Sequence, residues 1–129
     1  MDLLIDPASA VPIYAQVVEQ IRRLVAAGGL VAGDKLLSVR DLAASLRINR
    51  NTAAKAYQLL ETQGVLETRA GQGTFIAAGG SRWSSEERLR CVAASLDRAL
   101  VEAYHLEIPL TDLPAILGER IEAFRGDRS

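Results

Sequence analysis

The sequence predicts a mainly α-helical fold that contains one small β-hairpin. Two observations support this fold class. Apolar residues recur at the 3.6-residue spacing of an amphipathic helix in five separate stretches of the 129-residue chain. Between the third and the fourth stretch, two short runs of strand-forming residues flank a turn that contains glycine, which is the pattern of a hairpin.

The first helix is expected over residues 12–27. Pro12 suits its first turn, because a helix leaves the amide of that position unused, and Gly28 can end it. Its apolar face consists of Ile13, Val17, Ile21, Leu24 and Val25. The connection that follows, at residues 31–36, is expected to be irregular.

Two further helices are expected in close succession. Ser38 has the capping-box spacing to Asp41 at the start of the second, whose apolar residues are Val39, Leu42, Ala43 and Leu46. After a two-residue turn, Asn49 is a favoured N-cap for a third helix over residues 49–63, which Gly64 can end. The buried face of this third helix is predicted to be Ala53, Ala56, Tyr57 and Leu60.

The hairpin completes the first part of the chain. Its strands are the runs VLETR and TFIA, and the sequence AGQG turns between them. Three helices followed by a hairpin, with only two residues between the second and third helix, describe a winged helix-turn-helix. A small α+β domain without a ligand is the alternative, and composition alone does not choose between the two.

The second part of the chain begins after the sequence AGGS, which is predicted to be a linker. We therefore expect two domains, a winged helix-turn-helix at residues 1–78 and a short helical region at residues 79–129. Ser84 and Glu87 match a capping box in front of one long amphipathic helix.

That long helix is expected over residues 85–104. Pro109 interrupts the chain, and Thr111 can cap a last helix over residues 113–125. The two helices are predicted to form a two-helix C-terminal hairpin with an exposed apolar stripe, which needs a partner.

Composition excludes several classes of function. A single cysteine excludes an internal disulfide, and one histidine with one cysteine cannot form a typical zinc site. No nucleophile, base and anion-binding group combine into a catalytic set. We expect no enzyme, no catalytic residue, no cofactor and no metal. The chain has no apolar run of about 18 residues and no secretory signal, so we expect a soluble cytoplasmic protein without membrane contact.

Charge is distributed unevenly, although the net charge is only −1. Residues 35–60 contain five basic residues and one acid, a net charge of +4, whereas residues 77–129 contain seven basic residues and nine acids, a net charge of −2. This asymmetry indicates that the first segment meets an anion and that the second does something else.

The predicted third helix carries side chains that suit a DNA major groove. Arg50 and Asn51 can form paired hydrogen bonds with guanine and adenine edges, Thr52 can touch a thymine methyl group, and Lys55 suits a phosphate. The small alanines between them let the helix enter the groove. A face that is merely solvated is the alternative reading of the same pattern.

Residues 11–76 resemble the DNA-binding domain of the GntR family of bacterial transcription regulators. The resemblance rests on SVRDLA, NRNTAAKAY, LLETQGVLETR and GQGTF, which occur in this order and spacing. The SVRDLA and NRNT elements, followed by a tail of about fifty residues, are most similar to the short YtrA-like branch. The resemblance implies a sequence-specific DNA-binding regulator, most naturally a homodimeric repressor of a pseudo-palindromic operator. A winged-helix module that binds protein is the alternative.

The resemblance also implies positions for DNA contact. Helix two contributes its first turn, helix three enters the major groove, and residues 69–74 form the wing. The implied DNA-binding residues are Ser38, Arg40, Asn49, Arg50, Asn51, Thr52, Lys55, Arg69, Gly71, Gln72 and Gly73.

Three residues depart from the pattern of the family. Leu37 replaces a proline, which makes the entry to helix two less rigid. Arg47 replaces a glycine, adding charge beside helix three but removing the residue best suited to a left-handed turn. Ala54 stands where many relatives have arginine or glutamine, so the operator cannot be taken from a relative.

The second part of the chain is too short for a large effector-binding domain, and no residue identifies a small-molecule effector. A second copy of the chain is the expected partner of its apolar stripe, because a dimer places two recognition helices on one face of the duplex. The residues expected at the dimer interface are Leu89, Val92, Leu96, Leu100, Leu117 and Ile121. Packing of these helices onto their own winged helix is the alternative.

Overall fold

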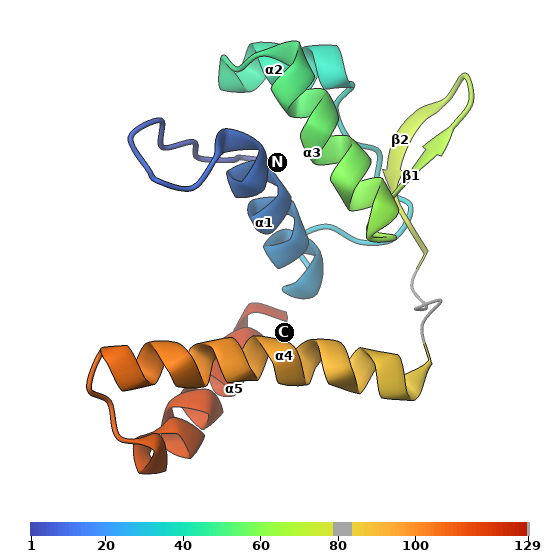
Figure 1. Cartoon of the computed structure of the whole chain (residues 1–129). Coiled ribbons are helices and arrows are strands. Elements are labelled where there is room, and N and C mark those ends of the chain that lie inside the picture. Colours follow the sequence, from blue (N-terminus) through green and yellow to red (C-terminus); the bar gives the residue numbers. More distant parts are fainter. Residues whose placement is uncertain (79–83, 129) are drawn as a thin grey trace. The chain divides into compact units, whose positions relative to one another are not determined.

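The computed structural model describes residues 1–78 and 84–128, which are shown in Figure 1. The chain consists of two compact units, Met1–Gly79 and Gly80–Ser129. Of the predicted linker at residues 78–81, all but Ala78 lies outside the described residues.

The first unit has the predicted winged helix-turn-helix fold. Its helices are α1 (Ile13–Ala26), α2 (Val39–Leu46) and α3 (Arg50–Thr62), and its strands are β1 (Leu66–Arg69) and β2 (Gly73–Ile76). Helix α3 packs against both α1 and α2 and also contacts β1. It is therefore the central element, and the hairpin follows directly from its C-terminal end (Figure 1).

The predicted helix caps are present. The Ser38 hydroxyl accepts a hydrogen bond of 3.1 Å from the Asp41 amide at the start of α2. The Asn49 side-chain oxygen accepts one of 2.7 Å from the Asn51 amide at the start of α3. Helix α1 ends where Gly28 adopts a φ of 84°, a left-handed conformation that glycine adopts without a steric cost.

The core of the first unit is built around α3 and takes buried residues from α1, α2 and the hairpin. The predicted buried face of α3 is confirmed, since Ala53, Ala56, Tyr57 and Leu60 are all buried. On α1, Val17 and Ile21 are fully buried. Alanine side chains on α3 allow the two helices to approach closely, because they fill little space at the contact.

The hairpin is antiparallel, with Leu66 opposite Ile76 and Arg69 opposite Gly73. The connection before α2 is more ordered than expected, because Lys35 forms an isolated antiparallel bridge with Phe75. The Leu36 amide donates to the Thr74 carbonyl at 2.8 Å, and the Ile76 amide donates to the Asp34 carbonyl at 2.9 Å. The wing is thus a small sheet with a third short segment along β2.

One partly buried side-chain hydrogen bond joins α3 to the entry of α2. The Tyr57 hydroxyl donates to the Leu37 carbonyl at 2.7 Å. Burial raises the pKa of Tyr57 to about 12, because ionisation would place a charge in the core. Leu37 replaces the proline expected from the family pattern, and this bond holds its backbone in place.

The second unit consists of α4 (Ser85–His105), a 3-10 turn η1 (Leu110–Asp112) and α5 (Leu113–Arg128). The predicted cap of α4 is present, since the Ser84 hydroxyl accepts a hydrogen bond of 3.2 Å from the Glu87 amide. Thr111 lies inside η1, which runs directly into α5, so the expected cap by Thr111 is replaced by this turn. Both helices contact η1.

The apolar residues of the second unit are largely exposed. Leu89, Val92, Leu96 and Leu100 on α4 are between 40% and 70% exposed, and Ala103 is the buried residue of that helix. Across the described parts of the chain, no helix is both long and apolar enough to cross a membrane.

We expect the Tyr57–Leu37 hydrogen bond to stabilise the first unit measurably. Replacing Tyr57 with Phe removes the bond while keeping the ring, and should lower the free energy of unfolding by about 1 kcal/mol at neutral pH. Urea unfolding followed by circular dichroism measures this difference. Replacing the exposed Tyr104 with Phe is the control and should leave the unfolding midpoint unchanged.

The same tyrosine predicts a pH dependence. An unfolded tyrosine ionises near pH 10, whereas folded Tyr57 holds its proton up to about pH 12. The unfolded state therefore releases the proton first, and stability falls as the pH rises from about 10 to about 12. The Tyr57→Phe variant should lose less stability over this range, and equal slopes for both proteins would contradict the assignment.

Candidate nucleic-acid interface

The first turns of α3 present the predicted reading residues to solvent. Arg50 and Asn51 are exposed, and Thr52 is half-buried. Their orientation follows from the packing of the helix, because Ala53 and Ala56 hold the opposite face in the core. The arrangement leaves a guanidinium and a side-chain amide free to form hydrogen bonds with an external partner.

Lys55 is exposed, but its ammonium group has a neighbour. It lies over the ring of Tyr14 on α1, 4.0 Å from the ring centroid. This contact is a cation–π interaction, which holds the lysine at the edge between α1 and α3. The sequence predicted the lysine as a phosphate contact and did not predict the tyrosine beneath it.

The foot of α2 carries two predicted residues. The Ser38 hydroxyl is occupied as an acceptor by the Asp41 amide, which leaves the hydroxyl proton as a possible donor. Arg40 is exposed in the first turn of the helix. None of the ion pairs between described side chains includes Arg40, Arg50 or Lys55, so these cations are not neutralised by a salt bridge within that part of the chain.

The tip of the wing is a tight glycine turn. The Gln72 amide donates to the Arg69 carbonyl at 2.9 Å, and Gly71 and Gly73 have φ values of 73° and 120°. Glycine is favoured at both positions, because side chains rarely tolerate these conformations. Gln72 is exposed between them.

Arg69 is held along the hairpin and does not extend freely. Its Nη2 atom lies 2.7 Å from Glu67 Oε1, and Nε lies 3.1 Å from the same oxygen. Its guanidinium also stacks on the Phe75 ring, 4.1 Å from the centroid. The arginine is therefore oriented, and part of its charge is offset.

Arg47 ends α2 in a left-handed conformation, with φ 56° and ψ 47°. Its amide donates to the Ala44 carbonyl, and the Ile48 amide donates to the Ala43 carbonyl at 3.0 Å, which closes the helix. Glycine meets this requirement without strain, whereas an L-residue with a side chain does not. The arginine keeps the turn and places an exposed cation directly before α3.

All of the predicted DNA-binding residues lie in the first unit, on α2, on α3, at the N-caps of these helices and on the hairpin. Sequence reasoning missed Tyr14 and Lys35. Lys35 contributes to the basic segment, but its pairing with the wing depends on a contact between residues 40 positions apart, which no local pattern indicates.

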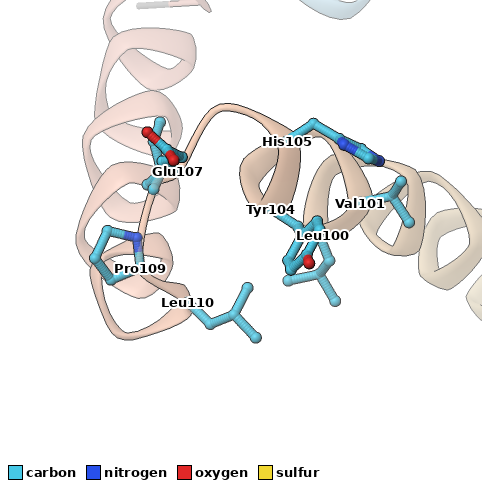
Figure 2. Close-up of a pocket in the computed structure, with 8 residues that line it drawn as sticks. Leu100, Val101, Tyr104, His105, Glu107, Pro109 and Leu110 are labelled. Atoms are coloured by element: carbon cyan, nitrogen blue, oxygen red, sulfur yellow. The ribbon is translucent and has the colours of Figure 1, made fainter.

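The predicted interface residues of the second unit occupy one exposed stretch of α4 and the following helix. Leu117 and Ile121 on α5 are exposed, as are Ile116 and Phe124. A groove of about 810 Å³ lies where α4 meets the turn. Leu100, Tyr104 and Pro109 are among the side chains that line it (Figure 2). Among the side chains described, no three histidine, cysteine or acidic residues gather to hold a metal ion.

Comparison with known proteins matches the first unit to one family. Residues 13–76 fit the model of the bacterial regulatory proteins of the gntR family. Over 109 residues the chain is 37% identical to the HTH-type transcriptional repressor YtrA of Bacillus subtilis. The aligned residues cover 84% of this chain and 84% of that protein.

Some of the similar solved structures cover nearly the whole chain, and others cover mainly the first unit. A transcriptional antiterminator from Listeria monocytogenes is 33% identical, with a TM-score of 0.83 over 96% of this chain and 92% of its own. The DNA-binding domain of AraR in complex with operator ORX1 is 32% identical, with a TM-score of 0.53 over 60% of this chain and 96% of its own.

We predict that Arg47 costs the protein stability. Replacing it with glycine should relieve the left-handed strain and raise the free energy of unfolding by roughly 0.5 to 1 kcal/mol, measured by urea unfolding. The matched control is Ala44→Gly on the same helix, which should lower stability by about 1 kcal/mol. A fall in stability for both variants would show that the turn carries no strain.

Proposed function

Because the chain belongs to the GntR family of bacterial regulatory proteins, as a YtrA-like transcription regulator, we propose that it represses transcription as a homodimer that occludes a pseudo-palindromic operator. It acts in the cytoplasm, where bacterial DNA lies, and has no catalytic role. The observation that carries the proposal is the exposed pair Arg50 and Asn51 on the first turn of α3, opposite a fully buried helix face.

The residues of the first unit divide into two roles. Arg50 and Asn51 read base edges in the major groove, because their side chains can form paired hydrogen bonds with guanine and adenine. Arg40, Lys55 and the wing contact the backbone, where charge and not sequence sets the affinity. A related DNA-binding domain, that of AraR, has been solved with its operator, which supports this use of the fold.

Thr52 and Asn49 have more limited roles in this proposal. Thr52 is half-buried, so it offers its methyl or hydroxyl group only at close range. Ser38 and Asn49 serve first as helix caps, and they contact DNA with the donors that capping leaves free. Gly71 and Gly73 shape the turn that brings Gln72 to the duplex.

The second unit provides the dimer contact. Leu89, Val92 and Leu96 on α4 recur on one side of the helix, and they are all exposed. Leaving such a stripe in water is unfavourable by about 25 cal/mol for each Å² of apolar surface. A second copy covers it and sets two α3 helices about 34 to 36 Å apart, the spacing of successive major grooves on one face of DNA.

Base reading and phosphate contact should separate in binding measurements. We expect Arg50→Ala to cost roughly 1 to 3 kcal/mol on the operator and to relax sequence preference. Lys55→Ala should weaken binding to operator and random duplex alike and flatten the dependence on salt. A selection experiment with purified protein supplies the operator, and fluorescence anisotropy measures both duplexes. Equal losses for the two variants on both duplexes would contradict this division of roles.

The dimer contact is tested on α4. Leu96→Glu should convert a dimer into a monomer at micromolar concentration in sedimentation velocity, because it buries a carboxylate in an apolar interface. Ala94→Glu adds the same charge on the other side of the helix and should leave the dimer intact. A wild-type protein that sediments as a stable monomer would overturn the proposal that this face joins two copies.

A further inference from the structure

The outer face of the wing sheet carries charge that the assigned DNA-binding residues do not include. Leu36, Leu66 and Ile76 are buried and mark the inner face of the sheet. Because strand residues alternate between faces, their neighbours Lys35, Glu67 and Phe75 lie on the outer face. Arg69 follows two residues after Glu67 and shares this face.

Gly73 allows Lys35 to cross this face closely. A β-carbon at Gly73 would lie 2.9 Å from Cε of Lys35 and 3.6 Å from its Nζ atom. The first distance is shorter than a normal contact between carbon atoms, so a larger residue at position 73 would displace the flexible end of the lysine, and glycine leaves this path open. The ammonium group therefore lies beside Gly73, the first residue of β2. Gly73 is the residue paired with Arg69 in the hairpin register.

The charge of Lys35 is uncompensated on this face. Glu67 is the acid of the outer face, and its carboxylate is bound to Arg69 at 2.7 Å. The neighbouring Asp34 directs its carboxylate to the Val31 amide at 3.0 Å. No ion pair among the described side chains includes Lys35, which is exposed.

We propose that Lys35 is a further DNA-contacting residue, whose ammonium group binds a backbone phosphate beside the wing. The inference rests on the proposed function and extends its binding surface. Lysine is a compact point charge that suits a phosphate without reading sequence. Lys35 connects two parts of the surface, since it stands beside the wing and lies in the segment that leads into α2 and Arg40.

Lys35 is also the more available cation beside the Arg69–Gly73 end of the wing. Arg69 must share its guanidinium between Glu67, Phe75 and any phosphate. The ammonium group of Lys35 has no ion-pair partner in the described part of the chain, so it gives up mainly its hydration. A phosphate at this place therefore gains more from the lysine than from the arginine opposite it.

The test uses the full chain and a labelled 40-base-pair duplex of random sequence, since a phosphate contact does not depend on sequence. Lys35→Met keeps an unbranched stem over Gly73 and removes the charge. The affinity should fall about eightfold at 0.1 M salt for each protomer bound, and the slope of log K against log salt should flatten by about 0.9 per protomer. Lys35→Arg should retain both.

The matched control is Arg22→Met, which removes one exposed cation from α1. It should change the affinity less than twofold, because it alters only the overall field. The proposal is overturned if Lys35→Met behaves like Arg22→Met, or if Lys35→Arg loses as much as Lys35→Met. Circular dichroism of each variant verifies folding.

Failure of the proposed function gives a different result. In that case the wild-type protein shows no salt-dependent binding to any duplex. If the wild-type protein binds with a steep salt slope and the Lys35 variants match the control, DNA binding stands and only the contact by Lys35 is refuted.

Discussion

The outward orientation of the side chains on the first turn of α3 depends on the burial of the opposite side of that helix. Ala53, Ala56 and Leu60 are completely inaccessible, and the helix is held by α1, α2 and β1 at once. A helix fixed on one side has no freedom to rotate, so Arg50 and Asn51 remain directed outward before any partner arrives. Such preorganisation reduces the entropy that binding has to overcome. The alanines thus serve recognition although they touch no DNA.

Local rules in the sequence account for most of the fold. The caps by Ser38, Asn49 and Ser84 could be predicted because each depends on residues only two or three positions away. The 3.6-residue spacing likewise identified the buried face of α3. The candidate DNA-binding residues could be assigned only through the resemblance to a family. Composition alone does not distinguish a polar helix face that is merely solvated from one that contacts DNA bases.

Contacts between distant residues could not be predicted in this way. The Lys35–Phe75 bridge, the stacking of Lys55 on Tyr14 and the Tyr57–Leu37 bond join residues 20 to 41 positions apart. They arise only when helices and strands have packed. The cap expected from Thr111 differs for a local reason, since the backbone after Pro109 forms a 3-10 turn that contains this residue and runs directly into α5.

Asn49 and Asn51 illustrate how helix capping limits the hydrogen bonds that a side chain can offer to a partner. The oxygen of Asn49 already accepts the Asn51 amide at 2.7 Å, so the cap fixes the orientation of this side chain and uses one of the two lone pairs of its oxygen. Adenine presents a donor beside an acceptor in the major groove, and it needs a complementary amide with both functions available. No hydrogen bond among the described residues occupies the Asn51 side chain. Two residues of the same type therefore differ in freedom: the cap holds the Asn49 side chain in one orientation, whereas the Asn51 side chain can turn both its donor and its acceptor toward a partner.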